Sequence, residues 1–179
     1  MADDKQAGRT VARIDRLNDL VGRATAWLTL VMVVVTCVVV VMRYAFDAGF
    51  IWLQESVVWM HAMVFMLGAA YTLQRDDHVR VDVFYRQMSR RRRALVDLVG
   101  TLLFLWPLCA YLLVEAWDFV AVSWAIREAS RESGGLPYPL VPLLKSALLV
   151  MPALLALQGL VHAVRSVRVL RDPDPGGDD

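Results

Sequence analysis

The chain has 179 residues, of which 58% are hydrophobic, with a mean hydropathy of +0.47 and a formal net charge of +1. A soluble domain is about 45–50% apolar, so the excess predicts surface that faces lipid instead of water. The near-neutral charge argues against general nucleic-acid binding. The two cysteines, Cys37 and Cys109, cannot build a disulfide framework or a metal cluster.

The N-terminal segment, residues 1–23, is predicted to be cytoplasmic and to contain an amphipathic helix. It carries acidic residues and lacks the short apolar core and cleavage site of a secretory signal peptide. Apolar side chains recur at three- and four-residue steps within residues 9–23, with charged residues between them: Val11, Ile14, Leu17, Leu20 and Val21. We expect this helix to lie at the membrane interface before the first span.

Four stretches without Asp, Glu, Lys or Arg follow, at residues 24–42, 56–73, 98–114 and 146–164. Their lengths of 17 to 19 residues lie close to the roughly 20 that a helix needs to cross a bilayer. Valines and leucines in the first stretch favour insertion by roughly 3–6 kcal/mol. We therefore predict an all-α integral membrane protein whose four transmembrane helices form one membrane domain, residues 24–165. Four buried helices of a soluble protein are the alternative.

The distribution of basic residues predicts the orientation. Fifteen lie in the N-terminal segment, the loop after the second span and the C-terminal tail, against four in the other two loops. Because Lys and Arg concentrate in cytoplasmic loops, we expect both termini to be cytoplasmic. Residues 166–179 are then a disordered cytoplasmic tail.

The loop between the second and third spans contains the sequence QRDDHVRVDVFYRQMSRRRR, residues 74–93. We expect a short interfacial segment capped by Asp82, and Ser89 as the cap of the third span. The four arginines that follow, Arg90, Arg91, Arg92 and Arg93, would anchor the chain to anionic lipid headgroups on the cytoplasmic face. This charged loop is predicted to be an orientation anchor and to hold no active site.

The third helix is predicted to extend beyond residue 114 on the periplasmic side, with Trp117 and Trp124 along one face, until SGGLPYP stops it. Pro107 and Pro152 predict kinks in the third and fourth spans. The loop after the third helix places four charges beside large apolar side chains: Arg127, Glu128, Arg131 and Glu132. These four residues form a candidate periplasmic docking surface, and a solvated helix extension is the alternative.

Two histidines, His61 and His162, lie within the predicted spans, where an ionisable side chain is a functional hypothesis by default. Haem ligation between them requires similar depths, but their positions predict a separation of roughly 16 Å along the membrane normal. No phosphate loop, zinc spacing or nucleophile elbow occurs. We expect no catalytic, metal-binding or substrate-binding residue in this chain, no cofactor and no enzymatic activity.

The order of several weak motifs on this four-span frame resembles a known family. The motifs are WLQE at 52–55, LGAAYTLQRDDHVRVDVFY at 67–85 and the segment from LPYPL to the end of the last span. Together they resemble the small membrane subunit of TRAP (tripartite ATP-independent periplasmic) transporters, the DctQ-type family. The residues that carry the resemblance are Trp52, Gln54, Glu55, His78, Arg80, Asp82 and Lys145. The loop REASRESGGLPYP departs from the more compact pattern of the family.

The resemblance implies a multi-pass protein of the bacterial inner membrane that pairs with a large permease subunit as a membrane heterodimer. It also implies ion-gradient-driven uptake of a solute, such as an organic acid, that a periplasmic binding protein delivers. The small subunit would then act as a scaffold in the lipid bilayer. The alternative is a stand-alone assembly or regulatory membrane protein.

The predicted orientation can be tested with single cysteines placed at Gln87 and Gly134 in a cysteine-free background. An impermeant thiol reagent should label the Gly134→Cys variant in intact spheroplasts, and the Gln87→Cys variant only after permeabilisation. The opposite labelling pattern would reverse the predicted topology.

Overall fold

The computed structural model describes residues 2–75 and 88–171, and this part of the chain is helical with no strand. The helices are α1 (Ala2–Ala45), α2 (Ile51–Gln74), α4 (Arg90–Gly100), a π-helical turn η1 (Thr101–Leu105), α5 (Trp106–Ala125) and α6 (Leu140–Arg171). The units long and apolar enough to cross a membrane are Gly8–Ala45, Ile51–Gln74, Arg90–Ala125 and Leu140–Arg171. The all-α fold with four membrane-spanning helices is therefore confirmed.

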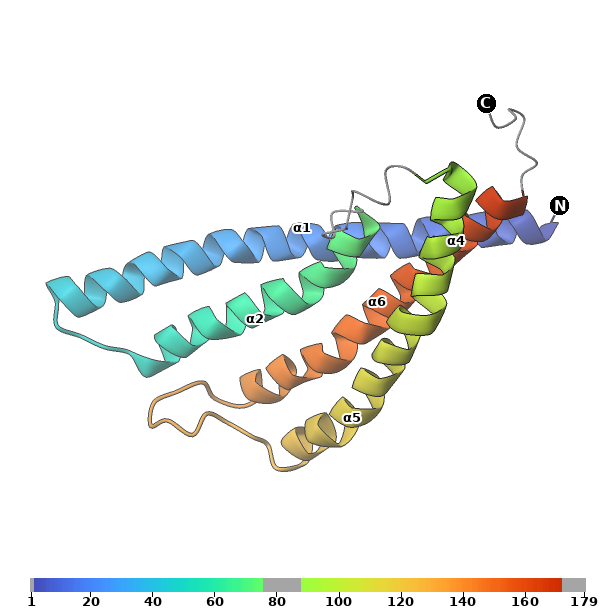
Figure 1. The fold of residues 1–179 in the computed structure, drawn as a ribbon. Helices are drawn as coiled ribbons and strands as arrows, with labels where there is room; N and C mark the ends of the chain where they lie inside the picture. The colour runs from blue at the N-terminus through green and yellow to red at the C-terminus, as the bar shows by residue number, and fades with distance from the viewer. Residues whose placement is uncertain (1, 76–87, 172–179) are drawn as a thin grey trace.

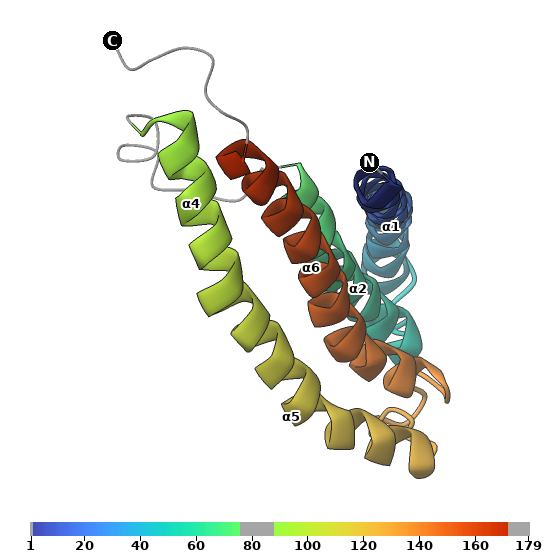
Figure 2. The same ribbon diagram turned by 90° about the vertical axis from the view of Figure 1, so that its right-hand side faces the viewer.

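The helices lie in an open row instead of a closed bundle. α1 packs against α2, α2 packs against α6, and α6 packs against both α4 and α5 (Figures 1 and 2). This places α6 in the middle of the row, and its apolar span is 22% buried, against 6% for that of α1. Most apolar side chains consequently face outward, as a protein surrounded by lipid requires.

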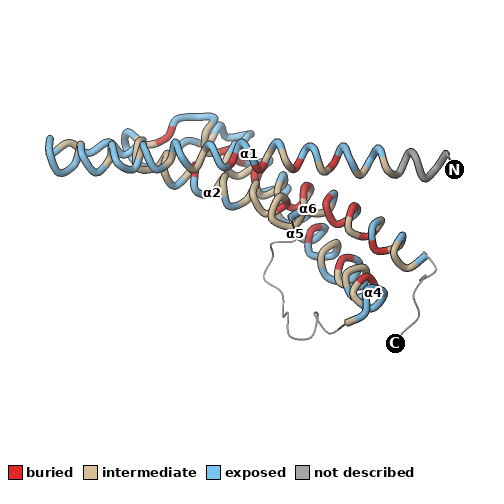
Figure 3. Tube along the Cα trace, turned by 90° about the horizontal axis from the view of Figure 1, so that it is seen from above, coloured by how far each residue is buried: buried red, intermediate tan, exposed pale blue. Residues whose placement is uncertain are grey.

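The N-terminal amphipathic segment continues into the first span without a break. α1 has 44 residues and is therefore about 66 Å long, roughly twice the thickness of a bilayer core. Its charged N-terminal part must extend beyond the hydrocarbon. The buried residues of its described part lie in the N-terminal half, as Figure 3 shows, and are Ile14, Asn18, Gly22 and Thr25.

The face of α1 that packs against other helices is distinct from the apolar face of residues 9–23, which was expected to lie at the membrane interface. Leu17 and Leu20 are 43% and 67% exposed, whereas Asn18 is 1% exposed. The reason is physical: next to a membrane, apolar side chains are well placed outside, and polar or small ones turn toward other helices. Of the predicted apolar set, Ile14 is the member that is buried.

The third spanning helix changes its geometry just before Pro107. The backbone N–H of Trp106 donates to the Thr101 carbonyl, five residues earlier, which makes one π-helical turn. Pro107 lacks an N–H and cannot complete the regular pattern four residues back, so a wider turn at this place relieves the conflict. The helix follows a curved path through this turn (Figure 2). Pro152 is buried inside α6, which remains one α-helix around it.

Two glycines allow close contact between helices. A Cβ on Gly22 of α1 would overlap the Tyr71 ring of α2, and a Cβ on Gly159 of α6 would lie 3.0 Å from Nε1 of Trp106. Small residues at such crossings increase van der Waals contact where lipid provides no hydrophobic driving force. The predicted helix cap at Ser89 is confirmed, since its side chain accepts a hydrogen bond from the Arg92 N–H at the start of α4.

Candidate functional site

The loop between α5 and α6 folds back over the first turns of α2, where a single carboxylate holds it. The Ser130 hydroxyl donates to Oε1 of Glu55 at 2.6 Å, and the Leu136 N–H donates to Oε2 at 2.7 Å. The Trp52 N–H donates to the Gly134 carbonyl at 3.1 Å, a second tie between the same segments. Leu136 is buried. We call this arrangement the Glu55 clamp.

The sequence SGGL of the loop suits this clamp. Gly134 has φ +78°, in the left-handed region that favours glycine. A Cβ on Gly135 would collide with the Ser130 side chain and lie 2.7 Å from Oε2 of Glu55. One glycine therefore turns the chain, and the other leaves room for the carboxylate.

A second contact closes the base of the same loop. Nζ of Lys145 in α6 lies 2.6 Å from Oε2 of Glu128 and 3.9 Å from the centre of the Phe119 ring in α5. The hydrogen bond from the Lys145 ammonium lowers the pKa of Glu128 below its ordinary value. Because that pKa is lowered in the folded chain, the pair contributes stability above the ordinary carboxyl pKa of about 4.3 and loses it as the pH falls through the folded value.

The four residues of the candidate docking surface consequently divide into two groups. Arg127, Arg131 and Glu132 are exposed, whereas the Glu128 side chain is only 19% exposed in its pair with Lys145. Glu128 is thus occupied in holding α5 to α6. Trp124, a large apolar residue near these charges, also joins α5 to α6, since its Nε1 donates to the Ser146 hydroxyl at 3.0 Å.

The family-signature residues that the structure describes gather at this end of the molecule. Glu55 forms the clamp, Trp52 contributes its backbone N–H, and Lys145 pairs with Glu128. Gln54 is half-buried beside them. The remaining signature positions, His78, Arg80 and Asp82, lie outside the described residues, as does the segment that Asp82 was expected to cap.

The opposite end of the molecule holds a polar cluster that sequence reasoning missed. Nδ2 of Asn18 donates to Oε1 of Gln158 at 2.6 Å, and both side chains are buried. Arg165 donates to Oδ2 of Asp15 at 2.6 Å, and Gln74 donates to the Asp15 backbone carbonyl at 3.1 Å. These contacts join α1, α2 and α6. The signal was Asn18, which follows Ile14 by four residues and precedes Gly22 by four on one helical face.

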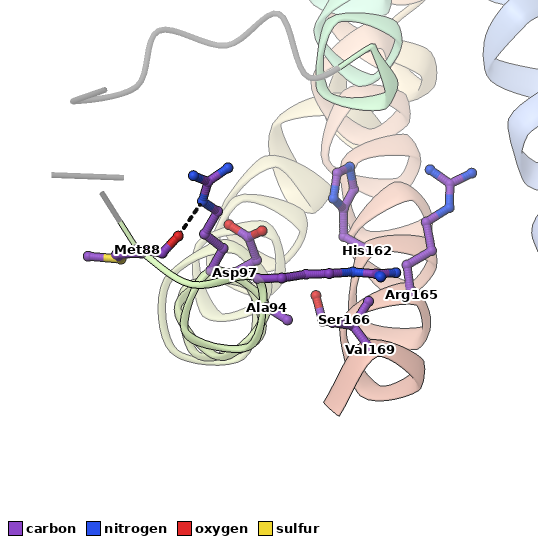
Figure 4. A pocket seen from close by; sticks show the side chains of 9 residues that line it. Met88, Ala94, Asp97, His162, Arg165, Ser166 and Val169 are labelled. Carbon is purple, nitrogen blue, oxygen red and sulfur yellow. Dashed lines mark hydrogen bonds between the residues drawn. The ribbon is translucent and has the colours of Figure 1, made fainter. Parts of the chain in front are cut away.

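The arginine run lies at this same end, at the start of α4. Arg90, Arg91 and Arg92 are exposed, and Arg93 is half-buried with its Nε donating to the Met88 carbonyl at 2.9 Å. Between α4 and α6 is a cavity of about 410 Å³, shown in Figure 4. Its lining includes Arg90, Arg93, Asp97, His162 and Arg165.

The two histidines of the spans occupy different surroundings. His61 is exposed on α2, and Nε2 of His162 lies 3.1 Å from the Leu73 carbonyl. Because a carbonyl only accepts, this contact is a hydrogen bond in the tautomer that carries the proton on Nε2. Within residues 2–75 and 88–171, no group of three His, Cys, Asp or Glu side chains is arranged to hold a metal ion. The Glu55 clamp, the Glu128–Lys145 pair and the contacts of Asp15 hold helices and loops in place.

Comparison with known proteins identifies relatives of this chain. The family model described as "Tripartite ATP-independent periplasmic transporters, DctQ component" matches residues 32–169. The "C4-dicarboxylate TRAP transporter small permease protein DctQ" of Vibrio cholerae serotype O1 is 32% identical over 88 residues. That match spans 49% of this chain and 38% of the Vibrio protein, so the chain covers well under two thirds of that relative. No solved structure matches.

The Glu55 clamp predicts a measurable effect on the loop. A Glu55→Gln variant keeps one acceptor oxygen but places an NH₂ donor against either the Ser130 hydroxyl or the Leu136 N–H. Amide hydrogen exchange across residues 129–137 should accelerate roughly tenfold or more, since a hydrogen bond to a charged acceptor is lost. A Gln54→Ala variant is the neighbouring control and should exchange like the parent. Unchanged exchange in Glu55→Gln would show that the carboxylate does not hold the loop.

Proposed function

Because the chain belongs to the DctQ component family of tripartite ATP-independent periplasmic transporters, we propose that it pairs with a large permease subunit and acts as its membrane scaffold. The chain itself is a multi-pass protein of the inner membrane. In the proposed complex, the permease subunit carries the solute site and the coupling ion, and this chain holds the permease in position in the bilayer.

The observation that carries this proposal is where the polar side chains lie. The four apolar stretches contain no Asp, Glu, Lys or Arg, and cross-helix ion pairs within residues 2–75 and 88–171 lie outside these stretches, as Asp15–Arg165, Asp19–Arg75 and Glu128–Lys145 show. Coupling to protons or sodium usually needs carboxylates or unwound polar backbone at membrane depth. A chain with apolar spans and fixed ends is suited to support a partner that supplies those groups.

One relative supports a proposal for the class of solute. The Vibrio protein is named as part of a C4-dicarboxylate transporter. We propose that this chain serves the uptake of an organic acid, driven by an ion gradient and delivered by a periplasmic binding protein.

The orientation with both termini in the cytoplasm is a part of this proposal. It places the Glu55 clamp and its loop in the periplasm, and the Asp15 cluster at the cytoplasmic face. Arg127, Arg131 and Glu132, which are exposed on that loop, then form the docking surface for the solute-loaded binding protein. Exposed charges of this kind increase the rate of encounter more than the final affinity.

The scaffold function is tested by reconstitution. The chain alone in liposomes should transport no organic acid when an ion gradient is imposed. Co-expressed with the large permease subunit, it should be extracted by detergent as a complex, and the pair should transport when the binding protein is added. Uptake by this chain alone contradicts the scaffold proposal, and failure to associate with any permease subunit favours the assembly or regulatory alternative.

The docking surface is tested by charge reversal at Arg127 and Arg131. The double variant Arg127→Glu/Arg131→Glu should lower uptake several-fold at limiting binding protein, because steering weakens, and the defect should shrink when binding protein is in excess. Assembly with the permease should be unchanged. Arg43→Glu, an exposed reversal near the end of α1, is the matched control. Normal uptake at every concentration of binding protein would leave the loop without a docking role.

A further inference from the structure

The cavity between α4 and α6 is basic and lies at the end of the molecule where α4 begins and α6 ends (Figures 1 and 4). Three arginines line it, Arg90, Arg93 and Arg165, together with one acidic residue, Asp97. Arginine and carboxylate charges in this lining therefore leave a positive excess. Ser166 and His162 add polar groups from α6, facing α4 across the cavity as Figure 4 shows.

The arginine run divides between this cavity and the outer surface. On an α-helix, residues three apart lie on one face, whereas adjacent residues do not. Arg90 and Arg93 accordingly line the cavity, while Arg91 and Arg92 are exposed and are not among its lining residues. The division follows from helix geometry, and it allows a specific site to be tested against diffuse attraction on the same helical turn.

The side chains of the two cavity arginines are placed differently. The bond from Nε of Arg93 to the Met88 carbonyl fixes this side chain at the start of α4. Arg90 makes no side-chain hydrogen bond or ion pair with the described residues. Arg165 is paired with Asp15 of α1 at 2.6 Å, so its charge is partly compensated. Arg90 is the cation that a ligand would pair with most completely.

The remaining walls indicate the class of ligand. Ala94 and Val169 give the cavity apolar surface, and the cavity lies at the start of one helix long and apolar enough to span a membrane, Arg90–Ala125, and near the end of another, Leu140–Arg171. A ligand that satisfies the whole surface has an anionic head with tetrahedral oxygens and long apolar chains. Guanidinium groups bind phosphate oxygens through paired hydrogen bonds, and basic pockets between transmembrane helices suit phospholipid headgroups.

We propose that the α4–α6 cavity binds the headgroup phosphate of an anionic phospholipid of the cardiolipin or phosphatidylglycerol type. Arg90 and Arg93 contact the phosphate, and the acyl chains extend from the cavity into the hydrocarbon beside the membrane-spanning parts of α4 and α6. The bound lipid fills the space between α4 and α6, so it ties the start of the third spanning helix to the end of the fourth. This site depends on neither the permease nor the orientation of the chain.

The experiment compares lipid binding by two double variants of the full chain. Arg90→Gln/Arg93→Gln removes the cavity pair, and Arg91→Gln/Arg92→Gln removes the same charge from the same helical turn outside the cavity. Native mass spectrometry in detergent, with added cardiolipin or phosphatidylcholine, measures the apparent Kd for each lipid. Circular dichroism of both variants verifies that their helix content equals that of the parent.

The cavity variant should bind cardiolipin about tenfold or more weakly than the parent, and the outer variant less than about threefold more weakly. Phosphatidylcholine should bind weakly to all three proteins, and glycerol phosphate at millimolar concentration should not displace cardiolipin. An equal loss of cardiolipin affinity in the two variants would indicate diffuse surface attraction and overturn the proposal. Unchanged cardiolipin affinity in both variants would also overturn it. Displacement by glycerol phosphate at a similar affinity would assign the site to a free phosphate compound instead of a lipid. If only the cavity variant loses helix content, the single variant Arg90→Gln replaces it in the binding measurement, and the same tenfold criterion applies.

Discussion

The absence of charged side chains from the apolar stretches is the constraint on which the rest of this structure depends. Inside the hydrocarbon, each helix satisfies its own backbone, and apolar side chains gain little by leaving lipid for another helix. Specific pairing of helices must therefore come from close packing and from polar contacts near the ends. The structure has both. The Asn18–Gln158 hydrogen bond joins α1 to α6 at one end, and the Glu55 clamp joins α2 to the loop before α6 at the other.

These end contacts explain how an open row of helices keeps its order. α1 is long and little buried in its span, and its apolar side chains are as well placed against lipid as against another helix, so they do little to select its neighbour. Gly22 lets it approach the Tyr71 ring of α2 closely, and Asn18 fixes its rotation by a buried hydrogen bond to α6. A single slip of one turn would leave Gln158 unpaired away from water, which costs more than the bond itself contributes.

The sequence predicted the features that follow from local chemistry. Apolar runs without charged residues predicted the four spans, and Ser89 before the arginine run predicted the cap of α4. Both signals are contained in neighbouring residues of the sequence. Pairings across long separations were out of reach: Asn18 and Gln158 are 140 residues apart. The face of α1 that packs against other helices was not predicted, because the spacing of apolar residues indicates only the face suited to the membrane interface, and Leu17 on that face is 43% exposed. Glu128 differs from the other three candidate docking residues because it pairs with Lys145. A single sequence does not show that these two side chains meet.

The same constraint connects the architecture to the proposed scaffold role. A subunit that supports a moving transport element should have directional polar contacts where they determine its own shape. Its surface toward the other subunit or lipid should be apolar, so that the neighbour can move along it. Here the ion pairs and the loop contacts lie outside the apolar stretches, and the exposed surface of the spans is mostly apolar, as on α1 from Leu30 to Val41. Dispersion contacts along such a surface are individually weak and have little directional preference, so they change little when a neighbour shifts. Polar groups in the middle of the spans would instead hold a partner in one register and oppose its movement.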